Sequence, residues 1–307
     1  AQWRPAHLLG KRLYQMMSSR NAPPSPQPGD FPAAMIQEWE AQWGKKIMLD
    51  LVETLGQEPP LSLRATRKTG APALLKELTG GSRLPVKAQL STLSPAGVRL
   101  SGYTPVLGTE AYKHGQFEIQ DEGSQVMALF ALWPELFADI LQSQPGKARA
   151  FKKLPEIPTD PLPWTVVDAC AGAGGKSLAM SDALKGKGRV YAYDVSATKL
   201  QALRRRATHA GLNNIQTVAL KLNEEAAAIA KFKRRAHAVL VDAPCSGWGV
   251  LRRNPDIKWR QSTEALARMP QIQLRLLNLY SELVSTGGRL VYGVCTFRQA
   301  ETQEVVD

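Results

Sequence analysis

The stretch "WTVVDACAGAGGKSLAMSDALKGKGRVYAYD", residues 164–194, determines the fold class of this chain. The apolar run WTVVDAC predicts a strand, AGAGGK a glycine-rich turn, SLAMSDALK a helix and RVYAYD a second strand. An order of strand, turn, helix and strand is typical of a parallel sheet, in which ligands bind at the carboxyl ends of the strands.

The same alternation continues toward the end of the chain. Ser196 is placed to cap the next helix, which Gly211 ends. Three more apolar strands are predicted over residues 215–220, 237–243 and 287–295. We therefore predict an α/β, Rossmann-like domain over residues 164–307, with a mainly parallel sheet and helices on both faces.

Residues 33–145 have a different pattern, that of a small α+β domain. Apolar residues at intervals of three or four predict an amphipathic helix over residues 33–55. The remaining elements are half-buried strands over 61–66 and 97–103, a helix over 71–78 between them, a strand ending at Gln120 and a helix from Ser124.

Two proline-rich stretches separate these parts. "NAPPSPQPGDFP" closes an N-terminal segment at residue 32, and residues 146–163 form a second predicted linker. The predicted organisation is thus 1–32, 33–145, the linker and 164–307.

The charge of the chain favours a polyanionic partner. Its 39 Lys and Arg exceed 27 Asp and Glu, which gives a net charge of +12 and a pI near 9.7. Nucleic acid is a stronger candidate than an anionic membrane, although a generically basic protein is equally compatible with charge alone.

The cysteine content and the hydropathy of the chain exclude several classes of protein. Three cysteines are too few for a disulfide framework, and there is no Cys-x-x-Cys motif or His cluster to hold a metal. No apolar run approaches the length of a membrane span, and the N-terminus lacks a signal peptide. We expect a soluble, cytoplasmic, monomeric protein with reduced thiols.

The glycine-rich turn and Asp194 indicate an adenosine-type cofactor. Glycines between a strand and a helix allow a ligand to approach the backbone, and a carboxylate at the next strand end can accept from ribose hydroxyls. A dinucleotide fingerprint is excluded, because Ser177 occupies its third glycine position. The alternative is that Asp194 only caps the following helix.

Two cysteines follow strand ends at the ligand edge. Cys245 follows "VLVDAP" and Cys295 lies in "VYGVCTF", so both are placed to face one cleft. A thiolate there is a strong nucleophile if a lysine or a helix N-terminus lowers its pKa. Either cysteine alone is more often a buried packing residue.

These segments together resemble a known family. "DACAGAGGKS", Asp194, "DAPCSGWGVLRRNPDIKW" and "VYGVCTFRQAE" are similar to the RNA cytosine-5 methyltransferases of the RsmB, Nop and Sun type, which use S-adenosylmethionine. Weaker likeness extends upstream, so the resemblance spans residues 33–307. It implies an accessory RNA-binding domain before the methyltransferase domain.

The resemblance also implies a role for each site residue. Cys295 would attack cytosine carbon 6, Cys245 would assist elimination and release of the RNA, and Asp242 would contact the cytosine edge. Lys176 would help to favour the thiolate. S-adenosylmethionine would be held by Cys170, Ala171, Gly172, Ala173, Gly174, Gly175, Lys176, Asp194, Asn223 and Asp242.

Basic residues are the candidates for contact with RNA. We expect Arg252, Arg253, Lys258 and Arg260 to contact phosphates, with Trp259 stacking or packing beside them. The runs 204–206 and 231–235 are expected to be solvated helix faces. The target base must leave its stack, so single-stranded or opened RNA is expected.

Several positions depart from the family pattern. Ala173 stands where proline is common, Val294 and Thr296 replace threonine and serine beside Cys295, and Asn223 replaces an aspartate. The family fold normally continues into two more strands, so we expect the domain to be incomplete at its C-terminus.

The predicted function is cytosine-5 methylation of RNA, ribosomal before transfer RNA. Two alternatives remain: a catalytically silent RNA-binding or ribosome-assembly factor on the same fold, and a DNA cytosine-5 methyltransferase with Cys245 as nucleophile.

Overall fold

The computed structural model describes residues 26–80, 87–101, 105–137, 164–221 and 224–307. They form two compact units. The smaller unit combines residues up to Pro59 with Trp248–Gln261, and the larger one combines Pro60–Gly247 with Ser262–Asp307. This division differs from the predicted domains, because the helix after residue 33 groups with a segment 200 residues later rather than with the strands that follow it. The predicted linker 146–163 lies outside the described residues.

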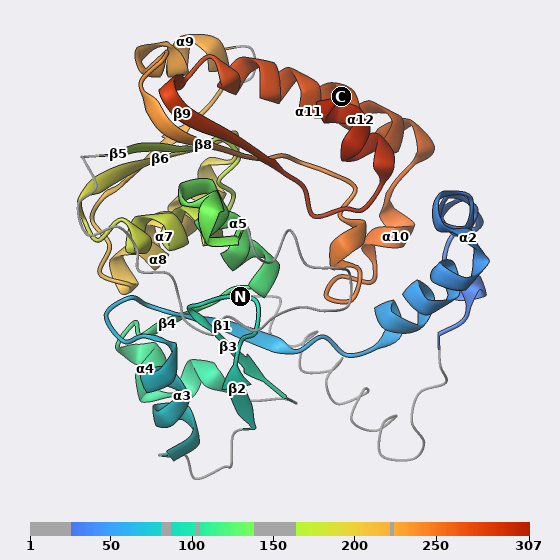
Figure 1. Cartoon of the computed structure of the whole chain (residues 1–307), viewed down its shortest axis with the longest axis horizontal. Coiled ribbons are helices and arrows are strands. Elements are labelled where there is room, and N and C mark those ends of the chain that lie inside the picture. The colour runs from blue at the N-terminus through green and yellow to red at the C-terminus, as the bar shows by residue number, and fades with distance from the viewer. Residues whose placement is uncertain (1–25, 81–86, 102–104, 138–163, 222–223) are drawn as a thin grey trace. The chain divides into compact units, whose positions relative to one another are not determined.

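The larger unit contains the predicted parallel sheet (Figure 1). Its strands are β5 (Trp164–Asp168), β6 (Gly188–Asp194), β7 (Ile215–Ala219), β8 (Ala236–Asp242) and β9 (Val284–Gly293). They are ordered β7-β6-β5-β8-β9, and every pair is parallel. The α/β, Rossmann-like fold class is therefore confirmed.

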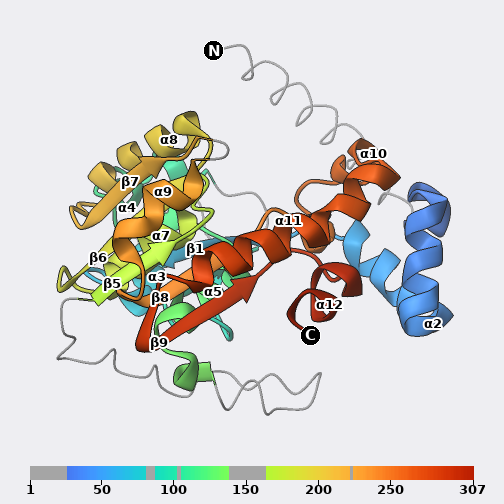
Figure 2. The same cartoon turned by 90° about the horizontal axis from the view of Figure 1, so that it is seen from above.

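Helices cover both faces of this sheet because its strands are apolar on both faces. Val166 and Leu240 pack with α5 (Glu122–Leu132) and α7 (Gly175–Ala183) on one face. Val167 and Val239 pack on the other face, against α9 (Glu225–Ile229) and α11 (Thr263–Ser281). Figure 2 shows α11 running along β9. This long helix, which contains Pro270, was not predicted.

Local signals set the helix ends. Gly174 adopts φ 89° just before α7, and Ser196 accepts from the Lys199 amide at the start of α8 (Ala197–His209), as predicted. Gly211, at φ 68°, follows the end of α8. Helix α5 begins at Glu122, two residues earlier than predicted, because Asp121 caps it by accepting from the Gly123 amide.

A second, antiparallel sheet precedes the parallel one in the same unit. Its strands are β1 (Leu61–Ala65), β2 (Ala88–Leu90), β3 (Gly97–Leu100) and β4 (Phe117–Ile119), ordered β2-β3-β1-β4. Leu63, Val98 and Phe117 form a core on one face with α3 (Ala71–Gly80). The short strand β2 was not predicted.

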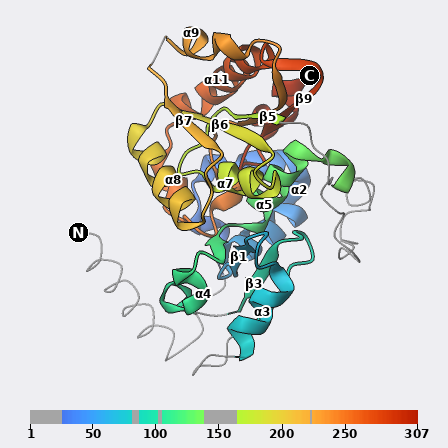
Figure 3. The ribbon, with the colours of Figure 1, turned by 90° about the vertical axis from the view of Figure 1, so that its left-hand side faces the viewer.

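The opposite face of this second sheet is polar and buried, so β1 is not half-buried as predicted. Arg64 donates to Gln120 at 2.8 Å and pairs with Asp182 of α7 at 3.1 Å. Arg206 of α8 pairs with Glu118 at 2.7 Å, so Arg206 does not lie on a solvated face as expected. Figure 3 shows the resulting layers: parallel sheet, α7 and α8, then the second sheet.

The smaller unit is built on α2 (Ala33–Gly56), which has a kink. Gly44 has φ 79° and ψ 162°, so the predicted single helix is two helical segments. Trp39 is fully buried, and its ring lies 5.8 Å from that of Trp248. Trp39 is therefore a core residue of this unit.

Short elements complete the described residues. They are η1 (Pro28–Asp30), η2 (Val106–Gly108), α4 (Glu110–Lys113), η3 (Pro134–Phe137), η4 (Ala230–Phe232), η5 (Trp248–Val250), α10 (Ile257–Arg260), η6 (Gln299–Glu301) and α12 (Gln303–Val306). None of the helices among the described residues has the length and apolar character needed to cross a membrane.

Candidate active site

The carboxyl ends of β8 and β9 bring the two cysteines together. Asp242, the last residue of β8, is in register with Gly293 of β9. Cys245 lies three residues beyond Asp242 and Cys295 two beyond Gly293. Their sulfur atoms are 3.3 Å apart, and both thiols are free. One sulfur can therefore donate a hydrogen bond to the other.

The two thiols have opposite pKa shifts. The hydrogen bond from Cys245 lowers the pKa of Cys295 to about 7, against the opposing effect of burial. The same hydrogen bond, together with burial, raises the pKa of Cys245. Above about pH 7 the pair thus holds mainly a Cys295 thiolate and a Cys245 thiol, which makes Cys295 the better nucleophile.

A lysine and a carboxylate lie beside this pair. Lys176, in the first turn of α7, places its Nζ 2.5 Å from Oδ2 of Asp242. Asp242 raises the pKa of Cys295 and Lys176 lowers it, and both effects are smaller than that of the Cys245 hydrogen bond. The sequence indicated a lysine or a helix N-terminus as the cause of a low thiol pKa, whereas the leading cause in the structure is the second cysteine.

The loop between β5 and α7 contains the candidate cofactor residues 170–176. Gly172 adopts φ 54°, has open space where a Cβ would lie, and donates its amide to Oδ2 of Asp194 at 2.8 Å. Oδ1 of Asp194 accepts from the Ser196 amide at 2.7 Å. The helix cap itself is Ser196, so Asp194 does not act as the cap.

These features fit a nucleoside ligand. The two backbone amides orient the Asp194 carboxylate, and each of its oxygens retains a lone pair for a ribose hydroxyl. The open space over Gly172 leaves room for a ligand to approach the backbone. Burial raises the pKa of the Cys170 thiol to about 12, so Cys170 stays neutral and contributes no charge. Asn223 lies outside the described residues.

The comparisons with known proteins agree with this geometry. A family model described as 16S rRNA methyltransferase RsmB/F matches residues 162–307. These residues therefore form a domain of the RsmB/F methyltransferase type.

Sequence similarity to curated relatives extends beyond this domain. The chain is 30% identical over 278 residues to the probable ribosomal RNA small subunit methyltransferase B of Bacillus subtilis, covering 90% of this chain and 54% of that protein. The corresponding Synechocystis protein is 29% identical, with 90% and 55% covered. The chain thus spans about half the length of the curated relatives it matches.

Solved structures share the fold of this chain at low sequence identity. The structure of NSun6 from Pyrococcus horikoshii superposes with a TM-score of 0.70 at 16% identity, covering 90% of this chain and 86% of that one. A methyltransferase homologue from the same organism gives a TM-score of 0.66 at 20% identity, with 90% and 81% covered. Both likenesses concern the fold.

The RsmB/F domain also contains a buried residue that joins the two cysteine loops. Glu301 is fully buried and accepts from the Ser246 amide and from Gln273, each at 2.9 Å, and from Arg298 at 3.1 Å. Ser246 follows Cys245, and Arg298 lies three residues after Cys295. Sequence reasoning missed Glu301, and the only signal for it is the Arg-x-x-Glu spacing after Cys295.

A second link crosses the same loops. The hydroxyl groups of Ser246 and Thr296 are 2.7 Å apart, so the threonine beside Cys295 still supplies a polar group. Gln273 also donates to the Pro244 carbonyl at 3.0 Å. These contacts hold both loops in one arrangement and thereby support the short distance between the sulfur atoms.

The four candidate RNA contacts all belong to the segment Trp248–Gln261, which is part of the smaller unit. Arg252 donates to the Gln57 carbonyl at 3.2 Å and to that of Glu58 at 2.9 Å, after the end of α2. Arg260 pairs with Asp256 at 2.6 Å on the surface, and Arg253 is exposed. Arg252 is thus a structural residue of this unit in addition to a candidate phosphate contact.

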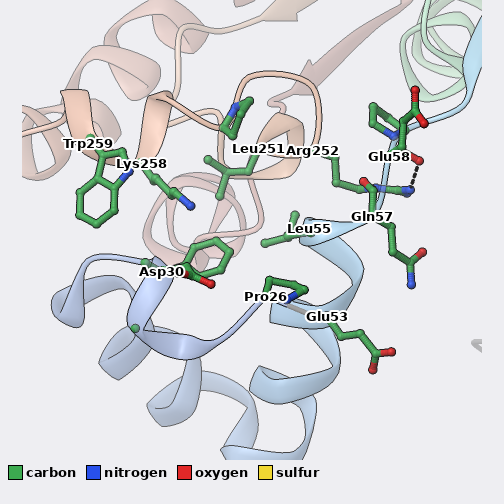
Figure 4. Close-up of a pocket in the computed structure, with 15 residues that line it drawn as sticks. Pro26, Asp30, Glu53, Leu55, Gln57, Glu58, Leu251, Arg252, Lys258 and Trp259 are labelled. Carbon is green, nitrogen blue, oxygen red and sulfur yellow. Dashed lines mark hydrogen bonds between the residues drawn. The ribbon is translucent and has the colours of Figure 1, made fainter. Parts of the chain in front are cut away.

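Lys258 lines a pocket of about 970 Å³ within the smaller unit (Figure 4). Its ammonium group lies 4.1 Å from the centroid of the Phe31 ring and 5.7 Å from that of Trp259. The Trp259 side chain is 62% exposed, so it does not serve as a packing residue. An exposed aromatic ring beside a cation is a suitable surface for stacking a base.

Proposed function

We propose that this protein transfers a methyl group from S-adenosylmethionine to carbon 5 of a cytosine in RNA, ribosomal RNA before transfer RNA. The observation that carries this proposal is the 3.3 Å separation of Cys245 and Cys295 beside the Lys176–Asp242 pair. The RsmB/F match and the names of the curated relatives support the choice of ribosomal RNA. The site of action is accordingly the cytoplasm, with the protein acting as a monomer.

The Cys295 thiolate begins the reaction by adding to carbon 6 of the cytosine. The electron pair of the C5–C6 double bond then makes carbon 5 nucleophilic, and carbon 5 forms the new bond to the methyl group. When bound, S-adenosylmethionine would supply that methyl group in electrophilic form, with its sulfonium–methyl bond breaking to leave S-adenosylhomocysteine. Transfer of the carbon 5 proton to water and cleavage of the bond between Sγ of Cys295 and carbon 6 then restore the aromatic ring and the Cys295 thiolate.

Cys245 and Asp242 assist separate steps. While Cys295 is bound to carbon 6 it no longer accepts a hydrogen bond, so the Cys245 thiol becomes available to assist elimination and release of the RNA. Asp242 contacts the cytosine edge near N3 and N4, where charge develops during addition. Lys176 keeps Asp242 oriented and adds positive charge near the thiolate.

The chain holds the cofactor with the loop from Cys170 to Lys176 and with Asp194. The Asp194 carboxylate accepts from the ribose hydroxyls, and Gly172 leaves space for the ligand. Asn223 and Asp242 complete the proposed set. Arg253, Lys258 and Arg260 contact RNA phosphates with Arg252, and Trp259 stacks on a base.

The test is transfer of labelled methyl from S-adenosylmethionine to unmodified ribosomal and transfer RNA. We expect wild type to transfer methyl, Cys295→Ala to transfer none, and Cys245→Ala to form a protein–RNA adduct that survives a denaturing gel. A Cys245→Ala protein without adduct and a Cys295→Ala protein with full activity would reverse the two roles, as a DNA-type mechanism requires. RNA binding without any transfer by wild type would instead favour a silent binding factor.

A further inference from the structure

A polar groove lies within the larger unit, apart from the candidate active site. It has a volume of about 1040 Å³ and is lined by residues 66–69, 114–116 and 208–214, together with both ends of the 181–186 segment. The first two stretches follow β1 and precede β4 of the antiparallel sheet. The other two connect helices to strands of the parallel sheet, so both sheets contribute to the groove.

The charge of the groove is positive. Arg67, Lys68 and Lys185 line it, and no ion pair is recorded for these three side chains in the part of the chain that the structure describes. The one carboxylate among its lining residues is Asp182. Asp182 is already engaged, because it pairs with Arg64 and accepts from the Arg67 amide at 2.8 Å. Three cationic side chains thus line the groove, and the carboxylate among its lining residues is paired with Arg64.

The walls of the groove are held together without a ligand. Gly115 has φ 62°, and a Cβ at this position would come within 2.3 Å of the His209 carbonyl, so the loop before β4 and the end of α8 meet closely here. The rings of Tyr112 and His209 are 4.9 Å apart. The contact between the Arg67 amide and Asp182 joins the loop after β1 to α7. A preformed groove binds without the cost of ordering its walls.

The groove lies at the opposite edge of the parallel sheet from the cysteines. Lys185 and residues 208–214 precede the starts of β6 and β7, whereas Cys245 and Cys295 follow the ends of β8 and β9. The seven residues of β6 span about 23 Å at roughly 3.3 Å per residue. A ligand confined to the target nucleotide therefore cannot reach the groove, but an extended polyanion can.

We propose that Arg67, Lys68 and Lys185 bind backbone phosphates of the RNA substrate at a distance from the modified cytosine. The inference rests on the proposed function for the identity of the polyanion. Phosphate contacts of this kind position a nucleic acid without reading its sequence. The groove therefore selects long or folded RNA over short fragments.

The experiment measures RNA binding by a triple variant, Arg67→Ala with Lys68→Ala and Lys185→Ala. Its matched control is Lys45→Ala with Lys46→Ala and Lys76→Ala, three exposed lysines outside the groove. Affinity is measured for an unmodified 16S rRNA transcript and for a short cytidine-containing oligonucleotide, between about 50 and 200 mM salt.

We expect the groove variant to bind the transcript about tenfold or more weakly than the control, with a slope of log affinity against log salt smaller by about two to three. Binding of the short oligonucleotide stays equal in the two variants. Equal affinity of both variants for the transcript overturns the inference. This holds even if the groove variant no longer binds inorganic phosphate or an acidic peptide.

Methyl transfer, measured on the same proteins, separates the two proposals. If wild type transfers methyl and the groove and control variants bind the transcript equally, the proposed function stands and the RNA-binding role of the groove is refuted. If wild type transfers no methyl and only the groove variant loses transcript binding, the groove is an RNA-binding surface and the proposed function is refuted.

Discussion

The sulfur atoms of Cys245 and Cys295 lie 3.3 Å apart although 50 residues separate them in the chain. The hydrogen bond between them, rather than the nearby lysine, is the main reason why the pKa of Cys295 falls to about 7. One cysteine thus activates the other before any substrate binds. The proposed division of roles between the two thiols follows from this asymmetry.

The first prediction concerns alkylation of Cys295. In wild type, the rate of its modification by iodoacetamide should rise with pH and reach half its maximum near pH 7, because the thiolate is the reactive form. Cys245→Ala should move this midpoint to higher pH, since the largest stabilising contact is lost. Mass spectrometry of the Cys295 peptide measures both profiles.

Lys176→Met serves as the comparison in that experiment. It should also raise the midpoint, but by less, because the lysine has the weaker effect on the Cys295 pKa. A Cys245→Ala midpoint at or below that of wild type would contradict the activating role of Cys245.

The second prediction concerns Asp168, which is buried and has a pKa raised to about 6, mainly by burial. Its pKa in the unfolded chain is near 3.9. The folded state therefore binds the extra proton between about pH 4 and 6, and the stability that Asp168 contributes is lost as pH rises through that window. Asp168→Asn carries no such dependence.

We therefore expect the free energy of unfolding of Asp168→Asn to increase relative to that of wild type as pH rises from about 4 to 7, by up to about 3 kcal/mol. Urea denaturation at several pH values measures this difference. Ser177, which donates to Asp168 at 2.6 Å, keeps an acceptor in the variant. A difference that is constant with pH would show that Asp168 titrates normally.

The third prediction compares two glycines of the cofactor loop. A Cβ on Gly174 would meet Cγ of Leu203 in α8 at 2.3 Å, whereas a Cβ on Gly172 meets nothing within 4 Å. Both have positive φ, which costs an alanine about 1 kcal/mol. Gly174→Ala should therefore be less stable than Gly172→Ala by a further 1–3 kcal/mol or so.

Thermal and urea unfolding measure the stability of these variants, and calorimetry measures binding of S-adenosylmethionine. Gly172→Ala is expected to weaken cofactor binding while the domain stays folded, because its Cβ enters the space proposed for the ligand. Unchanged cofactor affinity in Gly172→Ala would argue against that placement.

The fourth prediction assigns a positioning role to Glu301. Glu301→Gln retains the size of the side chain but replaces one acceptor oxygen by a donor, which disturbs the contacts to Ser246, Gln273 and Arg298. We expect kcat to fall about 10- to 100-fold while KM for S-adenosylmethionine is unchanged, because misplacement of reacting groups has costs of this order.

Glu304→Gln is the matched control, since Glu304 is exposed and three residues away. A purely structural role for Glu301 would lower thermal stability without moving the Cys295 alkylation midpoint. The positioning role requires that this midpoint rise, because the distance between the sulfur atoms depends on both loops.

The sequence predicted the parallel sheet well because each of its strands is a separate apolar run between clear turn and cap signals. It did less well with α11, whose Pro270 is atypical of a helix interior, and with β2, which has only three residues. It also predicted one long helix where Gly44 forms a kink, because helical spacing continues on both sides of that glycine.

The side-chain contacts between distant segments were beyond the reach of the sequence. Arg206 belongs to a basic run that is typical of a solvated face, yet it pairs with Glu118, 88 residues earlier. Likewise, Arg252 was expected to contact phosphates, and it also donates to the carbonyl groups of Gln57 and Glu58. These interaction partners are far apart in the sequence and meet only when the whole chain folds.

The sequence by itself thus determined the fold class and the edge of the sheet at which the two cysteines lie, because strand periodicity and position after a strand are local properties. Only the tertiary structure decided which thiol lowers the pKa of the other, that Glu301 joins the two loops, and that a basic groove forms between the two sheets. These features depend on distances of a few ångströms between segments far apart in the chain, which no local pattern records.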